Sequence, residues 1–143
     1  MLPAKYPRTR YRTHEPPDLT ARGERERLSS PALKAFFNIM GQWKVRDEDA
    51  RALLGGVSNG PFYEMKKHPD RLLDPDRLTR ISYLIGIYKG LRILHSEALA
   101  HDWVHRPNRN PIFAGQTPLA YMIRGGVPAL QVVRRLIDAR RAG

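Results

Sequence analysis

Apolar residues recur at helical spacing along this chain, and no stretch shows the strict alternation of a half-buried strand. The clearest run holds Leu33, Phe36, Phe37 and Met40, at positions i, i+3, i+4 and i+7. This spacing places all four side chains on one face of a helix. Since no internal repeat suggests another architecture, the pattern predicts an all-α fold.

Start and stop signals give the limits of the first helices. The helix with this stripe is expected to begin at Ser30 and Pro31 and to end at Gly41. A short second helix is expected from Asp47, a carboxylate that suits the positive end of a helix dipole, to the glycine pair 55–56.

The next two helices begin at recognisable caps. Ser58 or Asn59 caps the third, whose first turn tolerates Pro61. Asp74 and Pro75 begin the longest helix. Because apolar residues cover more than one of its faces, this helix is expected to lie at the centre of the core.

Three helices are expected in the last third of the chain. One covers residues 97–105 and stops ahead of Pro107, because a residue before proline is disfavoured in the helical conformation. A short helix begins at Thr117–Pro118 and closes at the glycine pair 125–126. The last begins at Pro128 and carries arginines in its final turns.

The chain of 143 residues carries a formal net charge of +11 and no cysteine. Its length suits one modest domain or two very small ones and excludes a large catalytic barrel. The positive charge favours a polyanion such as nucleic acid as a partner. The lack of cysteine excludes disulfides and thiolate sites and suits a reducing compartment. No apolar stretch is long enough for a signal peptide or a membrane span, so a cytoplasmic protein without a membrane partner is expected.

Residues 1–29 hold four prolines, alternating charges and few large aliphatic side chains. Such a composition buries too little apolar surface to offset the entropy lost on ordering. A flexible basic arm is therefore expected. Two interpretations stay open: Arg8, Arg10 and Arg12 contact DNA, or the arm is merely a solvated tail.

Residues 52–65 have the spacing of a helix-turn-helix. Gly56 permits the positive φ of the tight turn between the two helices. Val57, Phe62 and Met65 are expected to anchor the second helix on the core. Its opposite face is then free to enter a major groove. The candidate DNA-binding residues are Asn59, Gly60, Tyr63, Lys66, Lys67 and Arg71.

The lysines and Arg71 suit phosphates, whereas Asn59 and Tyr63 are better suited to base edges. Glu64 lies among them and would repel phosphate unless it accepts from a cytosine amine or pairs with a lysine. The alternative is a simple helical hairpin with no role in DNA binding.

The segment Trp103–Asn108, followed by Phe113, Gly115 and Thr117–Leu119, is the most specific pattern in the chain. It resembles the toxin-binding domain of the Xre/MbcA/ParS antitoxin family. With the preceding helix-turn-helix, the resemblance covers about residues 30–143. The expected organisation is an arm (1–29), a helix-turn-helix domain for DNA binding and dimerisation (30–95) and a small helical toxin-binding domain (96–143).

The resemblance implies a partner toxin of the RES type, which consumes NAD or uses it to modify a target, and whose active-site cleft the antitoxin blocks. It also implies a homodimer that binds operator DNA and represses its own operon. The inhibitory element would be the last helix and tail, supported by residues 103–119. The candidate toxin-binding residues are Arg134, Arg135, Asp138, Arg140, Arg141, Ala142 and Gly143.

This tail departs from the family pattern, in which related tails often carry tryptophan at the place of Arg140 and glycine at that of Ala142. Read from the residues alone, Trp103, Phe113 and Leu119 suit a core role, with Trp103 against the central helix. The arginines of the terminal helix are expected to have no core role. Deletion of residues 134–143 is therefore expected to spare the fold.

Other chemistry finds less support in the sequence. His101 and His105 lie four residues apart on one helix, with His95 before them, but two imidazoles are too few for a metal site. A small basic nuclease would need a clustered acid–base constellation. The chain is therefore expected to be no enzyme and to hold no cofactor or metal, and the remaining alternative is a stand-alone repressor without a toxin.

Overall fold

The computed structural model describes residues 16–142. Within this part the chain forms six α-helices, two short 3₁₀ helices and no strand, which confirms the predicted all-α fold. The helices are α1 (Arg22–Gln42), α2 (Asp47–Leu53), α3 (Asn59–Lys67), α4 (Pro75–Leu94), α5 (Glu97–Asp102) and α6 (Pro118–Ala142). The 3₁₀ helices η1 (Trp103–His105) and η2 (Pro111–Phe113) lie between α5 and α6.

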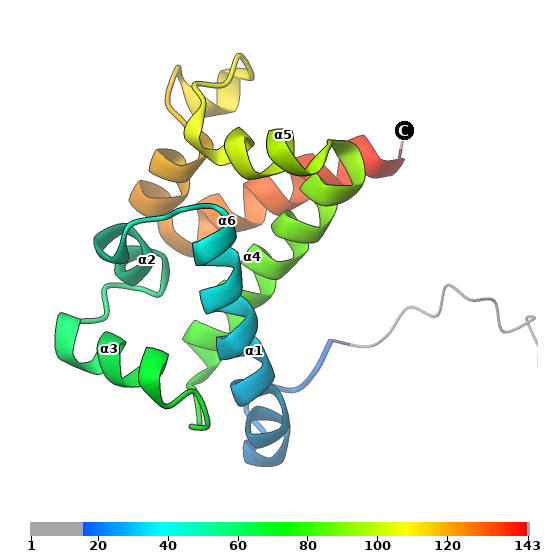
Figure 1. The fold of residues 1–143 in the computed structure, drawn as a ribbon. Helices are drawn as coiled ribbons and strands as arrows, with labels where there is room; N and C mark the ends of the chain where they lie inside the picture. Colours follow the sequence, from blue (N-terminus) through cyan, green and yellow to red (C-terminus); the bar gives the residue numbers. More distant parts are fainter. Residues whose placement is uncertain (1–15, 143) are drawn as a thin grey trace, which may run out of the picture.

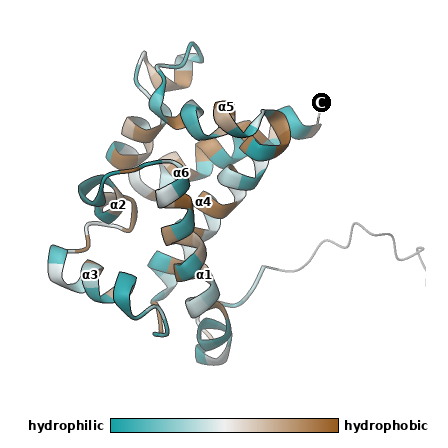
Figure 2. Ribbon diagram, in the orientation of Figure 1, coloured by the Kyte–Doolittle hydropathy of each residue, from teal (hydrophilic) through white to brown (hydrophobic). Residues whose placement is uncertain are grey.

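Helix α4 is the centre of the fold, as its apolar residues on several faces predicted. It packs against α1 on one side and α6 on another, and Figure 1 shows it passing between them. Ile81, Leu84, Ile87 and Leu91 of α4 are fully buried. Figure 2 shows the same division by hydropathy, since brown segments gather where the helices meet.

The start predicted for the first helix is wrong. Helix α1 begins at Arg22 and contains Pro31 in its interior, so residues 22–29, assigned to the flexible arm, are helical. Their alternating charges form ion pairs along the helix, Arg22 with Glu26 at 2.8 Å and Arg27 with Glu24 at 2.6 Å. Such spacing supports a helix as readily as it suggests disorder. The arm residues 1–15 lie outside the described part of the chain.

A buried serine fastens this early part of α1 to the rest of the molecule. The Ser29 hydroxyl donates to the carbonyl of Arg25 at 2.5 Å and accepts from the amide of Leu73 at 2.9 Å. Leu28 packs against the core. The helix therefore persists ahead of Pro31 because its inner face has tertiary partners, which composition does not reveal.

The later boundaries follow the predicted signals closely. Ser58 occupies the N-cap position of α3, and Asp74 that of α4, with Pro75 in the first turn. The helix expected over residues 97–105 narrows to a 3₁₀ turn at Trp103, and Arg106 is extended ahead of Pro107. The predicted start of α3 at Ser58 and the predicted end of the helical segment ahead of Pro107 are therefore confirmed.

The two C-terminal helices predicted on either side of the glycine pair are continuous except for a bend at Gly126, where φ is 64° and ψ is −147°. This backbone conformation is essentially restricted to glycine. The bend directs the second part of α6, which starts near Pro128, along α4 (Figure 1).

That second part packs on α4 at two positions, Gly86 and Gly90, where α4 has no side chain. A Cβ added to Gly86 of α4 would collide with the Arg134 guanidinium, and one added to Gly90 would collide with Cγ2 of Ile137. The glycines thus let α6 approach α4 closely. We call Gly86, Gly90, Arg134 and Ile137 the α4–α6 seam.

Candidate functional site

Two surfaces carry the residues that the sequence singled out, and the first begins at the turn between α2 and α3. Gly56 has φ +88°, as predicted for this turn. The amides of Gly56 and Val57 both donate to the carbonyl of Arg51, at 2.9 and 3.2 Å. These bonds close the end of α2, and the turn therefore sets the direction in which α3 leaves.

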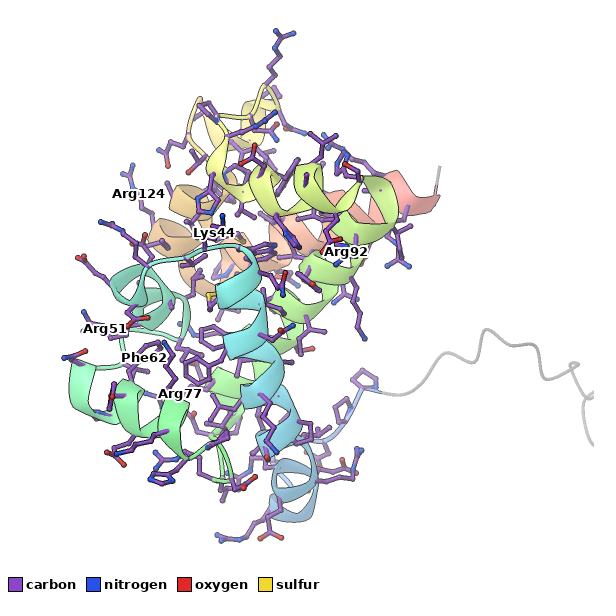
Figure 3. The ribbon with its side chains drawn as sticks, viewed as in Figure 1. Lys44, Arg51, Phe62, Arg77, Arg92 and Arg124 are labelled. Atoms are coloured by element: carbon purple, nitrogen blue, oxygen red, sulfur yellow. The ribbon has the colours of Figure 1, made fainter. Side chains whose placement is uncertain are left out.

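The buried side of α3 holds it on the core in the predicted way. Val57, Phe62 and Met65 are all buried. The ring of Phe62 meets that of Phe37 edge-on, with centroids 5.4 Å apart, and Figure 3 shows Phe62 between α3 and α1. The three predicted anchors are confirmed.

The other side of α3 is open. Figure 1 shows α3 at the outer edge of the molecule. All six candidate DNA-binding residues are exposed, five on α3 and Arg71 in the loop behind it. We call this surface the α3 face: Asn59, Gly60, Tyr63, Lys66, Lys67 and Arg71.

The α3 face is less positive than the whole chain suggests. Residues 44–71 hold six basic and five acidic residues. Lys66 pairs with Asp47 of α2, Nζ to Oδ1 at 3.6 Å, and not with Glu64. Both side chains are more than half exposed, so the pair contributes little stability and leaves Lys66 available. Binding here would depend on a few phosphate contacts rather than on a broad positive surface.

The loop behind α3 is held to α1 by polar contacts. The Ser30 hydroxyl donates to Oδ1 of Asp70 at 2.6 Å, and Nζ of Lys34 lies 3.7 Å from the same oxygen. This hydrogen bond, followed by the charge of Lys34, lowers the pKa of Asp70. Arg71 donates from Nε to the carbonyl of His68 at 3.2 Å and still faces solvent. The loop is thereby fixed with Arg71 on its outside.

The second surface lies at the end of α6, where the structure corrects one expectation. Arg134 is not free of a core role, because its guanidinium fills the space that Gly86 leaves. Its Nε donates to both carboxylate oxygens of Asp138, at 3.2 and 3.0 Å. Ile137 is fully buried against Gly90. Deleting residues 134–143 would therefore damage the fold, because it removes part of the α4–α6 seam.

The remaining candidates face outward. Arg135, Arg140, Arg141 and Ala142 are exposed. Arg141 lies 4.0 Å from Asp138, whereas Arg135 and Arg140 make no ion pair with another described residue. Gly143 lies outside the described residues. We call residues 139–142 the α6 tail.

The segment between α5 and α6 is packed on its own aromatic residues. Phe113 and Leu119 are buried, as predicted. Trp103 is half-buried and meets Phe113 at 6.0 Å, and Phe113 meets Tyr121 at 5.2 Å, both edge-on. Trp103 thus supports the loop of η2 through Phe113, and its contact with the central helix stays a prediction.

One important core residue was missed. Trp43 is almost fully buried, and its ring lies 6.1 Å from that of Tyr88. The signal was present, because Trp43 follows Phe36 and Met40 at helical spacing. Assigning the helix end to Gly41 hid it.

Two of the described histidines, His101 and His105, make contacts within the fold. His101 stacks on Tyr88 with centroids 6.3 Å apart, and Nε2 of His105 bonds to the carbonyl of Trp43. In residues 16–142 no group of three or more His, Cys, Asp or Glu side chains could hold a metal.

A groove of about 470 Å³ lies between α1 and α4, away from both surfaces. Leu19, Leu28, Leu78 and Ile85 are among its lining residues, and no His, Asp, Glu, Lys or Arg lines it. It offers no acid–base pair for catalysis. Among the described helices, none is both long and apolar enough to cross a lipid bilayer.

Comparison with known proteins agrees with this division into two surfaces. Residues 21–86 match the family model of the antitoxin Xre-like helix-turn-helix domain. Residues 90–143 match that of the antitoxin Xre/MbcA/ParS C-terminal toxin-binding domain. A Sinorhizobium fredii protein with the name "Uncharacterized protein y4oB" is 38% identical over 112 residues, which cover 78% of this chain and 84% of that protein. No solved structure matches.

Proposed function

The chain belongs to the Xre-type antitoxins, with a helix-turn-helix domain followed by a C-terminal toxin-binding domain, and from this premise we propose that it neutralises a RES-type toxin and represses its own operon. The toxin would consume NAD or use it to modify a target. The antitoxin would block the toxin's active-site cleft with the end of α6. Both matched families are antitoxin domains, and we assign the chain no catalytic role and no cofactor.

The exposed arginines at the end of α6 carry this proposal. Arg135 and Arg140 face solvent with no ion pair to another described residue. Guanidinium groups bind carboxylates through paired hydrogen bonds, so exposed arginines suit a cleft that is edged by acidic side chains. The end of α6 therefore has the charge expected of an element that enters such a site. The toxin-contacting residues are proposed as Arg135, Asp138, Arg140, Arg141, Ala142 and Gly143, with Arg134 supporting them from the seam.

The α3 face supports the second half of the proposal. It presents Asn59 and Tyr63 for base edges and Lys66, Lys67 and Arg71 for phosphates. Each copy has one such helix, and helix-turn-helix proteins commonly read two half-sites as a dimer. A cytoplasmic homodimer bound to its operator is therefore part of the proposal. The boundary between the DNA-binding and toxin-binding domains is proposed at residue 95, in the turn between α4 and α5.

Toxin neutralisation is tested with the protein encoded beside this chain's gene. The purified toxin is incubated with NAD, alone and with the antitoxin, and NAD loss is followed. The full chain should suppress NAD loss, and the chain lacking residues 139–143 should not. Arg124→Glu, at an exposed site in the part of α6 ahead of the bend, is the matched control and should suppress NAD loss fully.

The α6 tail is not the inhibitory element if the shortened chain inhibits as well as the full chain. If no toxin forms a complex with the full chain while an operator fragment binds it, the function is that of a stand-alone repressor. Turnover of RNA, DNA or NAD by the chain alone would overturn the assignment as a non-enzyme.

A further inference from the structure

Two aliphatic side chains stand out on the surface where α4 is followed by α5. Ile93, near the end of α4, is 63% exposed, and Leu99 of α5 is 50% exposed. Both lie in the part of the chain that matches the toxin-binding family, residues 90–143. Single exposed aliphatics are common, but two of this size beside a proposed binding element merit an explanation.

Ile93 lies on the same side of α4 as the seam glycines. Gly86, Gly90 and Ile93 are at positions i, i+4 and i+7, which a helix places on one face. Helix α6 covers the first two of these positions and ends at Ala142. Ile93 therefore continues the apolar surface of the seam beyond the point where α6 stops covering it.

Leu99 comes from the neighbouring element. Helix α5 packs on α4, and the ends of α4 and α6 lie beside it in Figure 1. The amide of Leu99 is held by the Ser96 cap at 3.4 Å. The two exposed aliphatic side chains thus come from two helices that pack on each other, and both lie within residues 90–143.

Basic residues lie on α4 close to Ile93 and at the end of α6. Lys89 and Arg92 are exposed on α4, and Arg140 and Arg141 form the α6 tail. Figure 3 shows Arg92 at the C-terminal part of α4. Two acidic residues pair with members of this basic set, Glu97 with Arg92 at 4.0 Å and Asp138 with Arg141 at 4.0 Å, against four basic side chains. The surroundings are therefore net positive, as suits a partner with an apolar depression edged by carboxylates or other anion-like groups.

We infer that Ile93 and Leu99 are the apolar anchors of the toxin interface, and that they dock beside the toxin's cleft while the α6 tail enters it. This inference rests on the proposed neutralisation of a toxin. An apolar centre with arginines at its edge is the usual make-up of a tight protein interface. The arginines alone would give charge recognition, and the two aliphatic side chains supply the desolvated centre that the tail lacks.

The test measures the affinity of antitoxin variants for the purified toxin encoded beside this chain's gene. Ile93→Asp and Leu99→Asp are each expected to weaken the complex by about 30-fold, the size of a central interface residue. Leu72→Asp is the matched control, since Leu72 is 38% exposed but lies in the loop between α3 and α4, outside residues 90–143. The control is expected to bind the toxin like the wild type.

Three further measurements separate the possible outcomes. The melting temperatures and the operator affinity of both variants should equal those of the wild type, because neither side chain is buried and neither lies on α3. Unchanged toxin affinity in both variants would overturn the inference and leave the proposed function intact. A change in the mass of the free chain in solution would assign the surface to a second copy instead. Failure of the wild type to bind the toxin would overturn both.

Discussion

The α3 face and the end of α6 carry the two proposed activities in different ways. On α3, buried and exposed residues are separate sets: Phe62 and Met65 hold the helix, and the polar side chains do no packing. On α6 one stretch does both, because Arg134 fills the space over Gly86 and Ile137 covers Gly90. Binding and folding are therefore carried by separate sets of residues on α3, whereas on α6 packing residues and proposed contact residues alternate up to residue 138.

The largest effect should come from the seam itself. Ile137→Ala removes a fully buried side chain and should lower the free energy of unfolding by roughly 2–5 kcal/mol. Arg140→Ala, three residues along the same helix, is exposed and should change it by less than about 0.5 kcal/mol. Urea denaturation of both variants measures the difference. Similar losses of unfolding free energy in the two variants would contradict the division of α6 into a packed part up to residue 138 and an exposed tail.

The next effect tests the close approach of α4 and α6. Gly90→Leu forces a side chain against Ile137 and should lower the free energy of unfolding by about 1–3 kcal/mol. The matched control is Gly41→Leu in α1, where an added Cβ meets nothing within 4 Å. There the higher helix propensity of leucine should raise stability by up to about 1 kcal/mol. Equal shifts of the melting temperature in the two variants would contradict the close approach of α6 to Gly90.

On the α3 face, binding should change without a change in stability. Lys66→Ala combined with Lys67→Ala should weaken operator binding across sequences and reduce the salt dependence of log Kd by about two units of slope, one for each phosphate contact. Lys89→Ala, an exposed lysine on α4, is the control. Gel-shift titrations at several salt concentrations give the slopes. An unchanged slope would place the DNA contact elsewhere.

The smallest expected change in stability concerns the hydrogen bond from Ser30 to Asp70, which holds the loop behind α3 to α1. Ser30→Ala removes the hydrogen bond that chiefly lowers the pKa of Asp70, so this pKa should rise toward its ordinary value. A lowered pKa favours the folded state above the ordinary carboxyl pKa, and the benefit is lost as pH falls through the lowered value. The variant should therefore lose less stability on acidification. An NMR titration checks this, and the Asp18 pKa, lowered by Thr20, should stay unchanged.

The sequence predicted the helices and the anchors of α3 well, because periodicity and caps are local signals. Phe62, Met65 and Gly56 were placed correctly for this reason. The start of α1 was not, since alternating charges look alike in a disordered tail and in a helix whose ion pairs face solvent.

The seam shows a second limit of the sequence. Gly86 and Gly90 have the spacing of a close helix contact, but nothing local identifies Arg134 and Ile137, more than forty residues later, as the side chains that fill the space. Arg134 looked like a free surface charge because the space that its guanidinium fills, over Gly86, lies on another helix. Cross-helix pairing of this kind becomes visible only in three dimensions.

The bend at Gly126 constrains how this molecule can diverge. No other residue adopts its φ of 64° with ψ of −147° without strain, so the glycine sets the angle at which the arginine-bearing part of α6 leaves the bend. A lineage adapting to a different toxin can vary nearly every outward side chain beyond it. A change of specificity is therefore expected from the side chains that this part of α6 presents, while the glycine at the bend keeps its direction.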